Sequence, residues 1–453
     1  MKIIVAGGGK VGSVLVRQLT EEGHEVTIID KSGDVLENLM QEYDVISVQG
    51  NAASMEVLEE AGIRDADLLI AATDMDEVNL LTCLSANSLN PSLHTIARIR
   101  DHDYRSQALN MQELFSINMA INPEYQAAAE ISRLLNFPGF FNIDTFAKGH
   151  VEIVSLRIKA DSPLNGTRLN KMNDIVHSQV LVCAVQRNGS CIIPDGNFEL
   201  KENDLLYITA STTNLTTLLK NLGIITKKIK SVLIAGGSLL SFYLAGILER
   251  RGMNVTLIEK DHDRCVELAE LLKNTTIVEG DASSQSFLES EGFENFDALV
   301  TLTGLDELNI VMSLYGNYRK IPQIITKLSH AENNRMLDSL PLGSVISPKE
   351  LVCNTIVRYV RAMQNKVGAA ITIHRIADGQ GEAIEFEVTE DTLNVGKPLK
   401  DLNIKPNILI ASITKGDKNE IPSGNSAFHK GDRVIIVTTK TSGIRQLNDI
   451  FVS

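Results

Sequence analysis

The chain of 453 residues has no tryptophan, only five cysteines and no excess of basic residues. The cysteines are odd in number and none form a C-x-x-C spacing, which argues against a disulfide scaffold or a zinc site and predicts reduced thiols. Lysine and arginine number 43 against 57 aspartates and glutamates, giving a net charge of −14. Broad nucleic-acid binding, or docking on anionic lipid through a basic patch, needs positive surface and is therefore disfavoured.

Two local patterns bear on the compartment. Cys183 and Cys191 could face each other across a hairpin, but disulfides are rare in cytosolic proteins, so we expect free thiols. The first residues lead directly into a strand and a glycine turn, unlike a secretory signal. The uncharged stretch 231–248 approaches the length of a membrane-spanning helix, but Gly236 and Gly237 interrupt it. We predict a strand, a turn and a buried helix there, in a cytoplasmic protein.

The two halves of the chain repeat each other. Gly7 recurs as Gly236 and Asp30 as Glu259, both 229 positions later. Other landmarks keep nearly the same offset, namely Gly50–Ala52 with Gly280–Ala282, Arg98 with Lys327, Pro123 with Pro348, and Asp204 with Asp432. A register held over this length indicates a tandem duplication of one long unit, not a solenoid of short repeats.

The first part of each unit alternates strands with helices. In the first unit we predict strands at 2–6, 25–29, 44–49, 68–72 and 94–99, and helices at 11–22, 35–42, 55–61 and 77–88. Continuously apolar strands between helices indicate a parallel sheet covered on both faces. Right-handed crossovers make it doubly wound. The predicted fold class is therefore α/β, with two tandem Rossmann-like sheets.

The second part of each unit contains short strands and forms a small α/β module, with strands predicted at 151–158, 180–185, 191–194 and 205–209, and at 384–388, 409–413 and 433–438. A linking helix joins the two parts, beginning at Asn122 or Pro123. In the second unit, Ser347 to Glu350 have capping-box spacing. The apolar side of this helix packs either within its own chain or against another subunit. The predicted segments are 1–121, 122–137, 138–226, 229–346, 347–364 and 365–453.

A glycine motif marks a nucleotide site in the first half. Gly7, Gly8, Gly9, Lys10, Val11 and Gly12 form G-x-G-x-x-G between a strand and a helix, the context that gives this pattern meaning. The first glycine permits a tight turn, the second lets backbone approach a pyrophosphate, and the third allows close helix packing. The helix N-terminus favours phosphate. Asp30 would accept from ribose hydroxyls and repel a 2′-phosphate, which favours NAD over NADP.

Three further strand ends lie at the expected ligand edge of the sheet. Asn51 and Ala52 follow the third strand, Thr73 and Asp74 the fourth, and Arg98 ends the fifth. These residues could hold ribose and phosphate groups. Each also has an ordinary structural explanation: a helix cap for Asn51 and Asp74, and a surface cation for Arg98. Their common position at one crevice favours binding.

The second half keeps the pattern in altered form, with candidate site residues Gly236, Gly237, Ser238, Leu239, Leu240, Glu259 and Asp281. Serine replaces the second and third motif glycines, and a Cβ at Ser238 would crowd a pyrophosphate. Asp74 corresponds to Gly304, and Arg98 to Lys327, which lacks the planar fork of arginine. We predict tight NAD binding in the first half and weak or no binding in the second.

Groups suited to hydride-transfer chemistry are missing from the first Rossmann-like part. Its histidines are His24, His94 and His102, and we expect His24 and His94 to be solvated. Lys10 would face phosphate or solvent. No substrate domain follows Arg98, and no known hydrolase or phosphotransfer motif is present. The nucleotide would then act by shifting a conformational equilibrium, so we predict a protein that is not an enzyme.

The whole chain resembles the TrkA family of regulatory subunits of Trk potassium-uptake systems, which are built from tandem RCK (KTN) domains. The matching segments are GGGKVG with Asp30, GNA at 50–52, ATD at 72–74, AR at 97–98, NPE at 122–124, GDA at 280–282 and SPKE at 347–350. The sequence differs from the family at Asn51, where aspartate is usual, and in its GGSLLS turn. The resemblance implies binding of NAD(H), with ATP or ADP as alternatives. It also implies assembly into a dimer or tetramer ring, and peripheral docking on a membrane potassium-translocating subunit.

Three hypotheses remain open at this point. The first is a nucleotide sensor that controls potassium uptake. The second is an NAD-dependent oxidoreductase, which the Rossmann pattern alone would permit. The third is a structural adaptor, which the altered second half would suit. Neither the choice between NAD and ATP nor the direction of gating follows from the residues.

Overall fold

The computed structural model describes residues 1–101, 104, 115–136, 140, 143–146, 151–224, 229–329, 337, 340–363, 370–377, 379–416, 418–439 and 444–452. His102 and the predicted segment ends at 137, 138, 226, 364, 365 and 453 lie outside these residues. The predicted domain boundaries therefore stay predictions.

The first unit opens with a six-stranded parallel sheet in the order β3-β2-β1-β4-β5-β6. Its strands are β1 (Lys2–Ala6), β2 (Glu25–Asp30), β3 (Ile46–Gln49), β4 (Leu68–Ala71), β5 (His94–Arg98) and β6 (Met119–Ile121). Its helices are α1 (Lys10–Glu21), α2 (Gly33–Glu42), α3 (Met55–Glu60) and α4 (Asp76–Leu89). This is the strand order of a dinucleotide-binding fold, with a switch point beside β1. It confirms the predicted doubly wound sheet.

The second unit repeats this sheet in the order β14-β13-β12-β15-β16-β17. Its strands are β12 (Ser231–Ala235), β13 (Asn254–Glu259), β14 (Thr275–Glu279), β15 (Ala298–Thr301), β16 (Gln323–Lys327) and β17 (Ser344–Ile346). Its helices are α10 (Leu239–Arg250), α11 (His262–Leu271), α12 (Gln285–Ser290) and α13 (Asp306–Tyr318). The uncharged stretch 231–248 thus forms β12, a turn and most of α10, as predicted. Across the described residues, no helix has the length and apolar character needed to span a membrane.

Each small module is a five-stranded antiparallel sheet. The first has β7 (Ile143–Phe146), β8 (Val151–Arg157), β9 (Leu181–Arg187), β10 (Ser190–Ile192) and β11 (Leu205–Thr209), with helices α8 (Met172–Val176) and α9 (Thr212–Asn221). The second has β18 (Thr372–Ile376), β19 (Gly381–Glu387), β20 (Ile408–Lys415), β21 (Lys418–Glu420) and β22 (Arg433–Thr439). In the β9–β10 hairpin Cys191 pairs with Gln186 instead of Cys183, and all five cysteines are free thiols, as expected.

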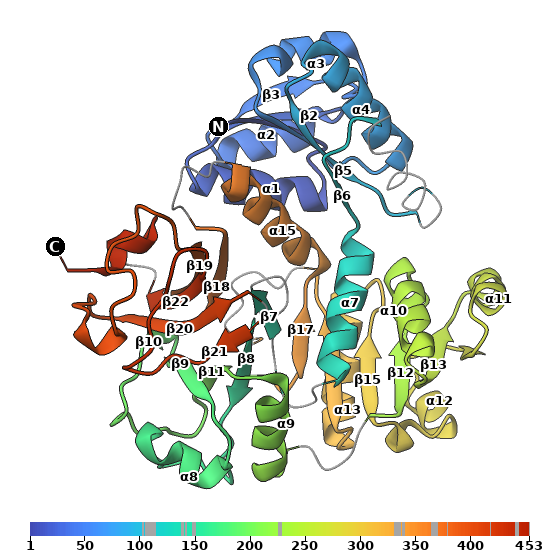
Figure 1. The fold of residues 1–453 in the computed structure, drawn as a ribbon. Helices are drawn as coiled ribbons and strands as arrows, with labels where there is room; N and C mark the ends of the chain where they lie inside the picture. Colours follow the sequence, from blue (N-terminus) through green and yellow to red (C-terminus); the bar gives the residue numbers. More distant parts are fainter. Residues whose placement is uncertain are drawn as a thin grey trace.

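The linking helices α7 (Pro123–Asn136) and α15 (Pro348–Met363) pack within the chain. Each contacts the first helix of the other unit: α7 lies against α10, and α15 lies against α1 (Figure 1). The two linking helices also contact each other. Of the two alternatives for their apolar sides, packing inside the chain is therefore the correct one.

The ends of the linking helices differ in their caps. Asn122 Oδ1 accepts a hydrogen bond from the backbone N–H of Tyr125 at 2.8 Å and caps α7. Ser347 Oγ is buried and has no hydrogen-bond partner among the described residues. The capping box predicted from its spacing is therefore wrong on the serine side.

The two small modules pack face to face. One apolar cluster joins their sheets, and its members include Phe146, Ile153 and Tyr207 from the first module and Ile435 and Val437 from the second. The Tyr207 hydroxyl also accepts a hydrogen bond from the backbone N–H of Ala377 at 2.8 Å. The two units therefore contact each other twice: through their linking helices and through their small modules.

Candidate functional site

The first glycine turn is shaped by three different requirements. Gly7 has φ of +103° and donates to the Ile29 carbonyl at 2.8 Å, so the turn needs a residue without a side chain. A Cβ at Gly12 would lie 1.8 Å from the Gly7 oxygen, which explains the third glycine by packing. A Cβ at Gly9 would meet no atom within 4 Å. The space above Gly9 is therefore open at the N-terminus of α1, where a phosphate would be stabilised.

Asp30 fixes this turn as well as facing the crevice. Its Oδ2 accepts from the Gly8 N–H at 2.6 Å, and its Oδ1 accepts from the Ser32 N–H at 2.9 Å. Each carboxylate oxygen keeps further acceptor capacity for a ribose hydroxyl. Of the remaining motif residues, Lys10 is exposed, whereas Val11 is only 4% exposed and packs in the core with α15. Val11 can therefore contribute backbone but not side chain to a ligand.

The next two strand ends are held by local hydrogen bonds. Asn51 Oδ1 accepts from the Ala53 N–H at 3.3 Å, an Asx turn in place of the helix cap that we considered. Ala52 is buried. The Thr73 hydroxyl bonds to Asn79 Oδ1 at 2.7 Å, while the Asp74 side chain is 94% exposed. Of these residues, only Asp74 has a side chain fully available to a solute.

Asn79 is a structural residue of this edge that the sequence did not reveal by motif. It is completely buried on α4 and donates from Nδ2 to the carbonyls of Thr73 and Arg98, at 3.1 and 2.9 Å. Its Oδ1 accepts from the Thr73 N–H at 2.8 Å. It thereby ties the end of β4 to the end of β5. The repeat was the available signal, because Asn309 makes the same set of bonds to Thr303 and Lys327.

Arg98 is the least satisfied charge at the crevice. Its side chain is 11% exposed and lies 3.7 Å from Glu124 Oε1 and 4.0 Å from Asp74 Oδ1, beyond hydrogen-bonding distance. Neither Arg98 Nε nor Glu124 Oε2 has a hydrogen-bond partner among the described residues. Burial lowers the pKa of Arg98, and the nearby Glu124 carboxylate opposes that shift. A buried guanidinium with an unused N–H suits an anionic ligand and is not the surface cation of our alternative reading.

The second glycine turn is capped by its own side chains. Gly236 has φ of +99°, but Ser238 Oγ accepts from the Ser241 N–H at 3.3 Å and contacts the Ser241 hydroxyl at 2.9 Å. Glu259 accepts from the Gly237 N–H at 2.5 Å. Arg264 Nε donates to the Gly237 carbonyl at 2.7 Å, a contact without a counterpart in the first turn. Leu239 begins α10, and Leu240 is buried in the core.

Two charged residues of the second half, Asp281 and Lys327, also follow or end strands of its parallel sheet. Asp281 Oδ1 accepts from the Ser283 N–H at 2.8 Å, and hydrogen bonds from Ser283 lower the pKa of Asp281. Lys327 ends β16, and burial lowers its pKa. The charges that act on Lys327 include Lys10 and Glu124 of the first half. Charges from both halves of the chain therefore act at this strand end.

One histidine contradicts the sequence prediction. His24 was expected to be solvated, but its side chain is 2% exposed between α1 and β2, so that prediction is wrong. His94 is exposed, as expected, and its Nδ1 lies 3.0 Å from the Tyr359 hydroxyl of α15. Both histidines lie near α15, a helix that is distant in the sequence, and the local sequence contains no sign of these contacts.

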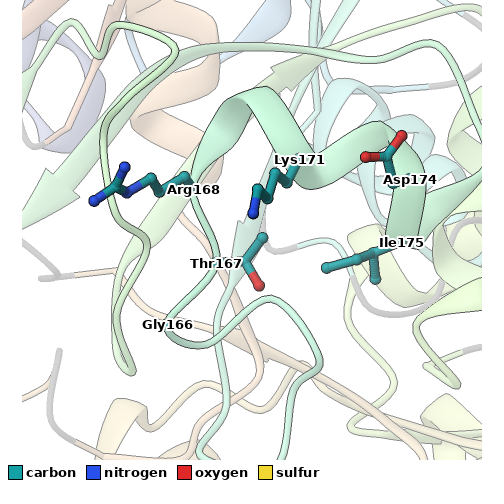
Figure 2. Close-up of a pocket in the computed structure, with 6 residues that line it drawn as sticks. All are labelled: Gly166, Thr167, Arg168, Lys171, Asp174 and Ile175. Carbon is teal, nitrogen blue, oxygen red and sulfur yellow. The ribbon is translucent and has the colours of Figure 1, made fainter.

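A hollow of about 400 Å³ also lies on the first small module, lined by Gly166, Thr167, Arg168, Lys171, Asp174 and Ile175. Figure 2 shows the Lys171 and Thr167 side chains near each other, with Arg168 and Asp174 extending in different directions. The polar groups do not converge on one point, which a small-molecule site requires. This geometry therefore supports no ligand in the hollow.

Known family models match both parts of each repeated unit. The TrkA-N domain model matches residues 3–123 and 232–348, and the TrkA-C domain model matches residues 153–223 and 383–452. The chain belongs to the TrkA family. A Trk system potassium uptake protein TrkA homolog of Archaeoglobus fulgidus is 30% identical over 451 residues, covering 100% of both chains. The Trk system potassium uptake protein TrkA of Vibrio alginolyticus is 28% identical, covering 100% of this chain and 98% of its own.

Solved structures agree on the fold. The GsuK RCK domain has a TM-score of 0.62 at 17% identity, covering 97% of this chain and 92% of its own. The GsuK channel bound to NAD has a TM-score of 0.62 at 18% identity, covering 97% of this chain and 76% of its own. The TrkA-family chain thus has the predicted RCK architecture. These TrkA relatives are potassium-uptake proteins, not oxidoreductases, which supports the non-enzymatic prediction.

Proposed function

We propose that this chain is a regulatory subunit that binds NAD(H) in the first-half crevice and controls a membrane potassium-translocating partner. The observation that carries the proposal is the open space above Gly9, together with the buried Arg98 at the same sheet edge, whose Nε has no hydrogen-bond partner among the residues that the structure describes. An open helix N-terminus and an unsatisfied guanidinium at one sheet edge together suit a pyrophosphate.

Different residues would contact different groups of the nucleotide. Gly7 to Gly12 would hold the pyrophosphate through backbone N–H groups, with Lys10 exposed beside them. Asp30 would accept from the adenosine ribose through its remaining lone pairs. Arg98 and Asp74 would contact the other phosphate and ribose groups. Asn51, Ala52 and Thr73 would shape the crevice with backbone, because their side chains are buried or held locally.

The second set, Gly236, Gly237, Ser238, Leu239, Leu240, Glu259 and Asp281, would bind more weakly. Ser238 and Ser241 already satisfy donors at the start of α10, where a phosphate would lie. Glu259 accepts from Gly237, Lys260 and Asp261, so less of its acceptor capacity remains than in Asp30. A phosphate would have to break these hydrogen bonds before it could form hydrogen bonds with the same N–H groups.

Relatives support the ligand and the partner. The solved GsuK channel of similar fold is bound to NAD, and another GsuK structure is bound to ADP. The relatives at about 28–30% identity are Trk system potassium uptake proteins. We therefore place the chain at the cytoplasmic face of the membrane, held there by its partner. ATP and ADP remain the alternative ligands, since both share the adenosine ribose and phosphates.

Binding would reach the rest of the chain through the linking helices. Glu124, the acidic neighbour of Arg98, lies in the first turn of α7. On the other side of the turn, the Val11 carbonyl accepts from Cys353 Sγ of α15 at 3.7 Å. A ligand that draws Arg98 away from Glu124 therefore changes the charge at the start of α7.

The repeat also suggests how copies assemble. Exposed apolar residues occur at matching places on the two halves: Met75 just before α4 corresponds to Leu305 just before α13, and Leu81 of α4 corresponds to Val311 of α13. We propose that these faces join copies of the chain into a dimer or tetramer ring. Equivalent patches on both halves suit repeated contacts around such a ring.

Calorimetry of the full chain with NAD, NADH, ATP and ADP in turn tests the site. The decisive variants exchange the middle residue of the two turns, Gly9→Ser and Ser238→Gly. Gly9 has φ of −69°, which serine adopts without strain, so the first variant should fold and lose binding. Ser238→Gly is the matched control and should keep the first-site affinity. Equal affinity in wild type and Gly9→Ser would refute the proposed site.

A further inference from the structure

A buried histidine lies where the two halves of the chain meet. The His24 side chain is 2% exposed, and neither ring nitrogen has a hydrogen-bond partner among the described residues. At the matching place in the second half the chain has Met253, which is also buried. The position therefore suits an uncharged side chain, and the first half has placed a titratable group there.

An ion pair beside this ring joins α1 to the linking helix of the other unit. Arg361 of α15 contacts both carboxylate oxygens of Glu22, at 2.5 and 3.1 Å. These side chains are 17% and 14% exposed. His24 Nε2 lies 3.9 Å from Glu22 Oε2, so the ring and the guanidinium face the same carboxylate. The amine of Met1 is the other charge that acts on the ring.

We propose that His24 makes the contact between α1 and α15 sensitive to protons, so that acidification loosens α15 from the first nucleotide-binding domain. A proton on Nε2 would bring a second cation to Glu22 and compete with Arg361 for its oxygens. It would also add a positive charge to the ring on which the charges of Arg361 and Met1 already act. Opening the contact lets the charged ring reach water, so proton uptake favours the open arrangement.

The sign of the effect follows from the surroundings of the ring. Burial lowers the pKa of His24, the Met1 amine and Arg361 lower it further, and Glu22 acts in the opposite direction. The closed contact therefore binds a proton less readily than the open one. Its stability is complete above the ordinary histidine pKa and is lost as pH falls below that value toward the depressed pKa.

The contact between α7 and α10 supplies an internal control. There, Arg251 at the end of α10 donates to the Ser132 carbonyl of α7 at 2.9 Å, and Met253 replaces the histidine. The two contacts occupy matching places in the repeat, but the α7 contact has Met253 where the other has His24, and an arginine bound to a carbonyl where the other has the Arg361–Glu22 ion pair. A general effect of acid on the protein should therefore act on α7 and α15 alike, whereas the proposed device acts on α15.

Hydrogen exchange of the full chain, followed by mass spectrometry on peptides from α7 and α15, tests the proposal. Between about pH 7.5 and about pH 5.5, corrected for intrinsic rates, α15 exchange should rise several-fold relative to α7. His24→Met, which introduces the residue of the second half, should remove the difference. Glu22→Gln removes the ion pair that joins α15 to α1, so α15 exchange should already be raised at about pH 7.5 and should increase less on acidification.

His24→Gln serves as a second variant if the methionine disturbs packing, and it should also flatten the response. The proposal is wrong if α15 and α7 respond equally in the unmodified chain. It is also wrong if the selective response of α15 persists in both His24 variants, because the proton would then bind elsewhere.

Discussion

The two glycine turns occupy the same place in two copies of one sheet, yet different atoms fill the start of the helix that follows. At the first turn, the space above Gly9 is open; at the second, the Ser238 hydroxyl caps α10. Both turns keep a first glycine with positive φ, +103° at Gly7 and +99° at Gly236. The fold therefore requires the first glycine, whereas a phosphate requires the second, and only the first half keeps both.

The third glycine position sharpens the same comparison. A Cβ at Gly12 would lie 1.8 Å from the Gly7 oxygen, but the second half carries Ser241 at the matching place. The two turns therefore cannot superpose at this point, although the strand order around them is the same. A duplicated scaffold can change its ligand edge while its sheet stays intact, since the two depend on different residues.

The largest expected effect comes from closing the first turn. Gly12→Ala forces the helix away from the Gly7 carbonyl, with an overpacking cost of about 3 kcal/mol, and should abolish nucleotide binding. The thermal midpoint followed by circular dichroism, together with calorimetry, measures both. Ser241→Ala is the matched control and should bind as the unmodified chain does. An unchanged midpoint in Gly12→Ala would mean that the close approach does not constrain the turn.

A smaller effect is expected from the asparagine braces. Asn79→Ala removes bonds to Thr73 and Arg98 and leaves buried backbone groups unpaired, at a cost of about 2 kcal/mol. Asn309→Ala should cost a similar amount of stability, measured by thermal unfolding. NADH affinity should fall in the first variant and not in the second. If both variants lost affinity equally, the assignment of the ligand to the first half would fail.

The smallest effect is expected at the ends of β5 and β16. Arg98→Lys keeps a positive charge but loses the planar fork, so NADH affinity should fall about tenfold, or about 1.4 kcal/mol. Lys327→Arg makes the reciprocal change and should not create a second binding event, because Ser238 still caps α10. Calorimetric stoichiometry measures this outcome. Two sites per chain in Lys327→Arg would contradict the role given to the serine.

Much of this architecture was predictable because it depends on local patterns. Apolar strands, glycine turns and the offset near 229 positions gave both doubly wound sheets, since backbone strain and burial act at each turn separately. The edge strands β6 and β17 were missed because three residues show no period. In the small modules β7, β18 and β21 were missed, because they are strands of three to five residues that show too little alternation to be recognised, although each pairs with the adjacent strand in a hairpin.

The site was predictable to the extent that it is built from backbone. The glycines, Asp30 and Arg98 all lie at the ligand edge, as their order in the chain requires. Local motifs did not reveal three side-chain details: the burial of His24, the brace at Asn79, which only the repeat could have indicated, and the Ser347 hydroxyl, which has no partner among the described residues. Each results from packing against an element distant in the chain or from a hydrogen bond without a motif. Periodicity and spacing contain no information on such contacts.

The exchange of linking helices, with α7 on α10 and α15 on α1, also bears on how such a chain could arise. It is the arrangement that two identical single-unit chains would adopt around a twofold axis. Fusing the two units replaces an association that depends on protein concentration with a permanent neighbour at a high effective concentration. Once joined, the partners no longer had to remain identical, so one copy could lose its ligand while it continued to support the other.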